Sequence, residues 1–225
     1  MNPIVVLDAG HGGKDPGGLS GSRLEKDDTL RLALAVEKVL EKSDVQVLQT
    51  RNSDQAVSLE QRSALANKAG AALFVSLHRN SFSHPQAHGN EVWIYPGCPE
   101  TTRQFAQNIH QALCRVGTTA DRGVKEGNYH VLRETHMPAI LVELGFISNS
   151  EDNSLFDLHL TAYAKTIAEE ICRYFSLETA LPEKEQLLYR VQAGAFANKS
   201  NALNMQRLLQ EKGFPSIVVQ DVKPS

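Results

Sequence analysis

The sequence predicts an α/β fold: a wound, mostly parallel sheet with helices on both faces, followed by a small C-terminal βαβ unit. Three short apolar runs, rich in β-branched residues, indicate strands buried on both faces; they span residues 4–7, 73–77 and 139–142. Longer segments between them carry apolar residues at helical spacing. Strands that alternate with helices in this way favour parallel pairing through crossover helices.

The first half of the chain alternates strands and helices. A glycine-rich loop follows the strand at 4–7, and we expect an amphipathic helix to begin near residues 28–29. A second strand is predicted at 45–48. Ser58, with Gln61 three residues later, predicts a capping box at the start of the next helix.

The second half carries the remaining elements of the sheet domain. A short run at 92–95, flanked by glycine and proline, predicts an edge strand. Helices are predicted at 101–116 and 158–175. The turn-forming residues of 117–127 predict a surface loop.

Three regions are predicted along the chain. Residues 1–176 form the α/β domain, and residues 177–186, rich in Glu, Lys and Thr, form a linker. Residues 187–225 hold the βαβ unit, with a strand at 188–193, a helix at 201–212 and a strand at 217–219. A lone βαβ unit is at the low edge of independent stability, so it must pack on something.

Composition excludes several classes of protein. The net charge of −3 and pI near 6.2 argue against a nucleic-acid partner and against a polybasic membrane anchor. No apolar run approaches the roughly 20 residues of a membrane span, and the residues before the first strand do not resemble a secretory signal, which is either removed from this sequence or not used. The three cysteines form no CxxC pair, which excludes a cysteine zinc knuckle.

Three polar residues follow predicted strands. His11, His78 and Glu143 each come at or just after a buried strand, at the sheet edge where α/β proteins bind ligands. Two histidines and a carboxylate are a catalytic zinc set with one position open for water. The alternative is that each histidine is an ordinary loop residue, because eight histidines and 26 acidic residues allow many such sets.

Glu143 carries the sharpest signal of the three. A carboxylate after a buried strand is costly unless it is paired, protonated or bound to a metal. The remaining histidines are interpreted as surface or loop groups: His84, His88, His110, His130, His136 and His159. His130 is the exception to watch, since it lies shortly before the strand that carries Glu143.

Four segments together resemble a known family. Residues 7–17, 25–26, 76–81 and 137–149 are similar, in order, to the signatures of zinc-dependent N-acetylmuramoyl-L-alanine amidases, above all the cell-wall amidases of sporulating bacteria. The resemblance covers roughly residues 3–175. It implies hydrolysis of the amide between the lactyl group of N-acetylmuramic acid and L-alanine in peptidoglycan, with the mother-cell wall a candidate substrate.

The resemblance also implies the roles of individual residues. His11, Glu25 and His78 would bind Zn²⁺, and Glu143 would be the catalytic acid and base. The assignment of Glu25 rests on the resemblance alone. A peptidoglycan substrate implies a location in the cell wall or outside the cell. Some members of the family carry an inhibitory helix inserted into the sheet domain. The segment between residues 85 and 101 is too short to be such a helix, so we expect an open groove.

Residues 189–196, 201–202 and 212–214 together resemble the first half of a sporulation-related repeat, a peptidoglycan-binding module. Either the module is truncated here, which we favour, or two chains pair their halves in a dimer. Two further functions stay open for the whole chain: a zinc peptidase that cuts stem peptides, and an inactive peptidoglycan-binding protein. All four site positions hold the functional residue type, which favours the amidase.

Overall fold

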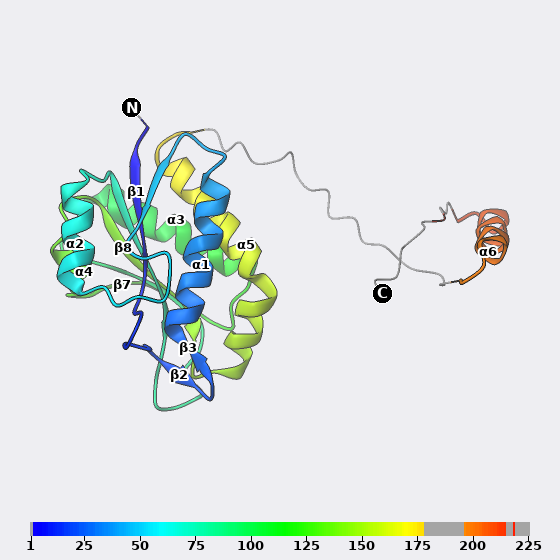
Figure 1. The fold of residues 1–225 in the computed structure, drawn as a ribbon, viewed down its shortest axis with the longest axis horizontal. Coiled ribbons are helices and arrows are strands. Elements are labelled where there is room, and N and C mark those ends of the chain that lie inside the picture. The colour runs from blue at the N-terminus through cyan, green and yellow to red at the C-terminus, as the bar shows by residue number, and fades with distance from the viewer. Residues whose placement is uncertain (1, 178–195, 215–217, 219–225) are drawn as a thin grey trace. The chain divides into compact units, whose positions relative to one another are not determined.

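The computed structural model describes residues 2–177, 196–214 and 218 (Figure 1). The chain divides into two compact units, Met1–Leu181 and Pro182–Ser225. Within the described residues no helix is both long and apolar enough to cross a membrane.

The first unit is built on a six-stranded sheet with the order β4-β1-β5-β8-β6-β7, among the residues described. Its strands are β1 (Ile4–Ala9), β4 (Gln46–Gln49), β5 (Leu73–Asn80), β6 (Asn90–Ile94), β7 (Asp121–Glu126) and β8 (Ala139–Phe146). All neighbouring pairs are parallel except β6 and β8. The predicted wound, mostly parallel sheet is confirmed. A short hairpin of β2 (Leu19–Ser20) and β3 (Arg23–Leu24) lies outside this sheet.

Helices cover both faces of the sheet, as predicted (Figure 1). The helices on one face are α1 (Glu25–Leu40), α3 (Glu100–Val116) and α5 (Ser150–Tyr174), and those on the other are α2 (Leu59–Lys68) and α4 (His130–Arg133). Successive strand residues divide between the two cores because side chains alternate across a strand. Val5 and Leu7 pack with the first set, whereas Val6 packs with the second.

Two helices begin earlier than the sequence pattern predicts. Helix α1 starts at Glu25, not near residues 28–29, and its first turn holds acidic residues that suit the positive end of the helix dipole. Helix α5 starts at Ser150, where Asn149 accepts hydrogen bonds from two backbone N–H groups. By contrast, the capping box of Ser58 and Gln61 is confirmed at the start of α2.

The edge of the sheet differs from the prediction. Strand β6 is not an edge strand, because β7 pairs beyond it, and β7 occupies the segment predicted to be a loop. Its sequence is polar and contains Gly123 at φ +75°, a composition typical of turns. Edge strands commonly carry charge, which discourages pairing with other chains, so composition alone did not separate this strand from a loop.

His110 was also misplaced by the sequence interpretation. It is only 3% exposed, and its Nε2 lies 2.6 Å from Asp121 Oδ1. This contact joins α3 to the exposed Asp121 at the start of β7. The reason is the unpredicted edge strand, which covers the α3 position that would otherwise face solvent.

In the second unit, helix α6 (Lys199–Glu211) confirms the helix predicted at 201–212. Asn198 caps it by accepting a hydrogen bond from the Ser200 N–H. The predicted linker beyond Leu177 and the strand at 188–193 lie outside the described residues. Of the strand predicted at 217–219, only Val218 lies within them.

Candidate metal centre and active site

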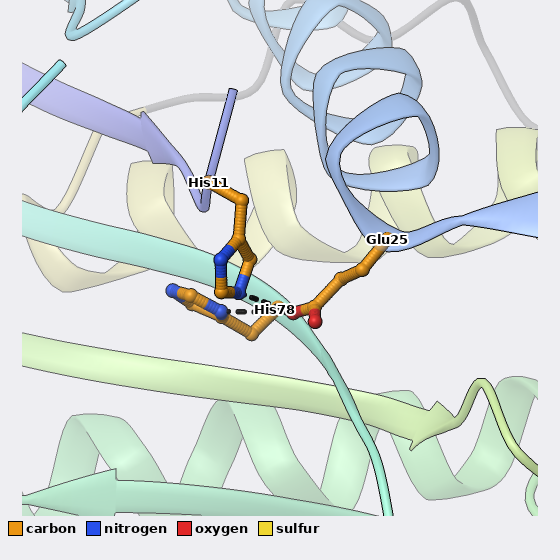
Figure 2. Close-up of side chains that lie close together, drawn as sticks. All are labelled: His11, Glu25 and His78. Carbon is orange, nitrogen blue, oxygen red and sulfur yellow. Dashed lines mark hydrogen bonds and ion pairs between the residues drawn. The ribbon is translucent and has the colours of Figure 1, made fainter. Parts of the chain in front are cut away.

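Three side chains from separate elements converge at one edge of the sheet. His11 follows β1, Glu25 begins α1 and His78 lies within β5. Glu25 Oε1 lies 3.1 Å from His11 Nε2 and 3.0 Å from His78 Nδ1. Figure 2 marks both contacts with dashed lines. One donor atom from each residue lies within 4.8 Å of the others, so together they form a candidate metal site.

Two glycines make room for this cluster. A Cβ at Gly10 would lie 2.3 Å from His78 Cε1. A Cβ at Gly17, whose φ is +66°, would lie 2.6 Å from both Glu25 Oε2 and His11 Cδ2. Neither position could therefore carry a side chain without displacing a ring or carboxylate of the site.

Two buried arginines hold the backbone that carries His11. Arg51 donates from Nε to the Ala9 carbonyl at 2.9 Å and from Nη2 to the Gly10 carbonyl at 2.8 Å. Arg62 donates to the carbonyls of Ala9 and His11, both at 2.7 Å. The sequence interpretation missed both residues. The position of Arg51 just after a strand, which it shares with His11, was a signal that could have found it.

Asp8 anchors Arg62 in turn. Its carboxylate accepts hydrogen bonds from Arg62 Nη1 at 2.6 Å, Thr50 Oγ1 at 2.7 Å and Ser76 Oγ at 2.7 Å. Burial alone would raise the pKa of Asp8, but the charge of Arg62 and these hydrogen bonds hold it below its ordinary value. Asp8 and Arg62 thus belong to a buried network in which the charges are paired and the carboxylate accepts three hydrogen bonds.

Glu25 is held as an anion between the two imidazoles. Its Oε2 accepts from the Gly18 N–H at 2.7 Å and its Oε1 from the Arg79 N–H at 3.0 Å. Burial opposes ionisation, but hydrogen bonds with His11 and His78 hold the pKa of Glu25 well below its usual range. Burial also opposes the charged form of His11 and so lowers its pKa. The contacts of His11 with Glu25 and Asp15 outweigh this effect, and the pKa of His11 is raised overall.

Asp15 orients the His11 ring. Its Oδ2 lies 2.9 Å from His11 Nδ1, which leaves Nε2 directed at Glu25 and His78. A carboxylate on the far nitrogen is the usual partner of a metal-binding imidazole, because it fixes the tautomer and the ring plane.

Glu143 lies beside the cluster on the neighbouring strand. It is the direct register partner of His78 across β5 and β8. Its Oε2 is buried and has no hydrogen-bond partner among the residues described. Burial first, and then the charges of Glu25 and Glu91, raise the pKa of Glu143 well above its ordinary value. Strand β8 extends past Glu143 to Phe146, so the residue lies inside the strand and not at its end.

The cluster fits a zinc ion. Two imidazole nitrogens and one carboxylate, with no thiolate, are the donor set of a catalytic zinc site with an open position. The Glu25 carboxylate already lies between the two imidazole rings as an anion. A cation bound there would replace the hydrogen bonds that now join this carboxylate to the ring nitrogens. Because Gly10 and Gly17 carry no side chains, the three donor residues have room to approach one another.

A cavity of about 750 Å³ contains all four predicted site residues, His11, Glu25, His78 and Glu143, in its walls. Tyr129 and His130, ahead of and within α4, form part of another wall. In the described segment between residue 85 and the start of α3, the structure has no helix that could fill this cavity.

A family model for N-acetylmuramoyl-L-alanine amidases matches residues 5–175, the segment that builds the sheet and the cavity. The chain belongs to the N-acetylmuramoyl-L-alanine amidase family. The amidase acts on peptidoglycan at the cell wall, and it hydrolyses the amide that links N-acetylmuramic acid to L-alanine. A second model, for the SPOR domain, matches residues 176–224.

Relatives support the assignment over most of the amidase chain. It is 40% identical to a sporulation-specific N-acetylmuramoyl-L-alanine amidase of Bacillus subtilis, over 96% of this chain and 84% of the relative. It is 38% identical, with the same coverage of both chains, to the amidase CwlM of Bacillus licheniformis. The catalytic domain of the amidase CwlV from Bacillus (Paenibacillus) polymyxa superposes with a TM-score of 0.73 at 37% identity, covering 78% of this chain and 99% of that one.

Proposed function

We propose that His11, Glu25 and His78 hold one zinc ion and that Glu143 is the catalytic acid and base of this amidase. The observation that carries the proposal is the convergence of the three donors within 4.8 Å beside Glu143, whose buried Oε2 has no partner among the described residues. Zinc, when bound, supplies a Lewis acid that polarises an amide carbonyl and acidifies water.

Glu143 moves the proton in this mechanism. Its carboxylate takes a proton from the attacking water, whose oxygen forms the new bond to the lactyl carbonyl carbon. The carbon–nitrogen bond then breaks, and Glu143 returns the proton to the alanine nitrogen. The second proton of the water leaves the new carboxyl group for the amine. The products are a lactyl carboxylate and a stem peptide with a protonated amino group, so atoms and charge balance.

Asp15, Arg51 and Arg62 act as positioning residues. Asp15 keeps Nε2 of His11 directed at the centre, and the two arginines fix the carbonyls of the loop that carries His11. Preorganisation of this kind lowers the cost of assembling the site when substrate binds.

The test combines metal analysis with digestion of purified cell wall. We expect about one zinc per chain, loss of digestion on chelation and recovery on addition of zinc. Mass analysis of the products should find free lactyl carboxyl groups and intact stem peptides. Cleavage within the stem would instead indicate a peptidase, and a metal-free, inactive protein would indicate a wall-binding protein.

We further propose that residues 1–176 form the catalytic domain, 177–186 a linker and 187–225 a wall-binding unit. The SPOR match and the sporulation-specific relative support a role at the mother-cell wall, with action in the wall or outside the cell. Sedimentation of the full chain with insoluble peptidoglycan tests the binding. The molecular mass in solution tests pairing of two chains through their half-repeats, because a monomer overturns the dimer.

A further inference from the structure

A row of side chains leads from the proposed zinc ligands toward the far edge of the sheet. His78 on β5 and Glu143 on β8 are register partners, and so are Glu143 and Glu91 on β6. Residues directly opposite one another on adjacent strands point to the same face of a sheet. The three therefore form one line across three strands, and the line continues to β7 through the contacts of Glu91.

Glu91 is a buried hub that binds two cations from the edge strand. Its Oε2 accepts hydrogen bonds from Arg122 Nε and Lys125 Nζ, both at 2.6 Å. Its Oε1 accepts from Asn80 Nδ2 at 2.7 Å and from Trp93 Nε1 at 3.1 Å. Burial would raise the pKa of Glu91, but Lys125 and Arg122 hold it below its ordinary value. The carboxylate thus fixes both cations in place.

Arg122 and Lys125 share one carboxylate, so the three side chains together carry a net positive charge. Arg122 and Lys125 keep about a third of their side chains exposed, at 35% and 32%. Among the residues described, the terminal Nη nitrogens of Arg122 have no hydrogen-bond partner, and its guanidinium lies 4.9 Å from the centre of the Phe146 ring. Lys125 Nζ lies 5.3 Å from the centre of the Trp93 ring. The guanidinium of Arg122 is therefore fixed through Nε, while its two terminal nitrogens can still donate hydrogen bonds. This arrangement is suited to binding a carboxylate.

The distance from the reaction centre fits a stem peptide. Neighbouring strands lie about 4.8 Å apart, so β7 lies roughly 10 Å along the row from Glu143. An extended peptide advances roughly 3.4 Å per residue, so about three residues span this distance. Asn80 links the two places, because it lines the cavity and also donates to Glu91.

We propose that Arg122 and Lys125 form a subsite for a carboxylate within the first three residues of the stem peptide. This inference rests on the proposed function, since it assumes that the scissile amide lies between the zinc ligands and Glu143. The subsite would select acidic stem peptides over amidated ones and would set the direction in which the peptide lies along the row.

The experiment compares two synthetic muramoyl tripeptides that differ only in whether the carboxyl groups of the second and third residues are free or amidated. The zinc-loaded full chain should hydrolyse both, with a KM about tenfold lower for the free acid, the value of one charge-assisted hydrogen bond. Arg122→Gln and Lys125→Gln should each raise KM for the free acid by about this factor, with kcat and the amidated substrate unchanged. Lys125→Arg should restore the preference.

Arg103→Gln is the matched control. Arg103 is a cation paired with Glu126 of the same edge strand, but it does not contact Glu91. It should leave both KM values unchanged.

Equal KM values of the wild type for the two substrates would overturn the subsite and leave the amidase mechanism standing, as would equal losses on both substrates in Lys125→Gln. Hydrolysis of neither substrate by the wild type would instead overturn the proposed function. If Arg122→Gln does not fold, Lys125→Gln still tests the subsite, because it removes only one of the two ion pairs of Glu91.

Discussion

Arg62 Nη1 donates a 2.6 Å hydrogen bond to Asp8 Oδ1, and the other terminal nitrogen of Arg62 donates to the carbonyl of His11. Both side chains of the pair are almost fully buried, with 4% and 1% exposed. The ion pair therefore connects the end of β1 to the loop that positions a proposed zinc ligand. We therefore expect stability and metal binding to be coupled at this point.

Replacing Arg62 should damage both properties. Arg62→Met leaves the Asp8 carboxylate buried without its cation, a loss of about 3–5 kcal/mol in the free energy of unfolding. Zinc affinity should also fall, because the His11 carbonyl loses its donor. Urea denaturation and competition with a chelator measure the two effects. Arg103→Met, which breaks a partly exposed pair with Glu126, should cost at most about 1 kcal/mol. A similar loss in both variants would contradict the role given to Arg62.

The contribution of Asp8 should depend on pH. Its pKa in the folded protein is lowered, so ionised Asp8 stabilises the fold fully above the unfolded pKa of about 3.9. This stabilisation is lost as the pH falls through the lower folded pKa. Asp8→Asn resembles the protonated residue, so the wild type and the variant should differ in unfolding free energy at pH 7 and converge as the pH falls from about 3.9 through the lower folded pKa of Asp8. A difference that stays constant with pH would sink the argument.

His78→Ala should lose both zinc and activity. The variant removes one of three donors and leaves an open space beside Gly10. Metal content after gel filtration and wall digestion measure the outcome. His84→Ala, at an exposed position, is the control and should keep both. Unchanged zinc in His78→Ala would remove this residue from the ligand set.

Glu143→Ala and Glu143→Gln should keep zinc but lose hydrolysis by at least about 10²-fold, the usual contribution of a general acid and base. Stability should change little or rise in Glu143→Gln, because the buried carboxylate has an oxygen without a partner in the described part of the chain. Turnover numbers and thermal unfolding of the zinc-loaded variants provide the check. Retained turnover would exclude Glu143 from the mechanism.

Asp15→Ala should weaken zinc binding by about 10- to 100-fold without abolishing it. The variant frees Nδ1 of His11, so the ring loses the contact that directs Nε2 toward the centre. Chelator competition gives the affinity, and activity should return at higher zinc concentration. An unchanged affinity would mean that the loop backbone alone orients the ring.

The sequence by itself determined the class of fold and pointed to three residues of the candidate site: His11, His78 and Glu143. Buried strands such as 73–77 and 139–142 are readable because short apolar, β-branched runs favour a strand that is covered on both faces. His78 and Glu143 stand out against such runs since their polarity conflicts with their surroundings. Glu25 could be found only through resemblance to a family, because a carboxylate beside a helix start is ordinary in composition.

The tertiary structure alone decided the partners of these residues. Strand β7 resembles a loop in composition, so its pairing with β6, and hence the contact of Arg122 and Lys125 with Glu91, could not be predicted from local pattern. Arg51 and Arg62 likewise acquire their roles only when distant segments meet at the carbonyls of residues 9–11. Local sequence encodes burial and periodicity, whereas charge pairing across strands depends on register, which is set by the whole sheet.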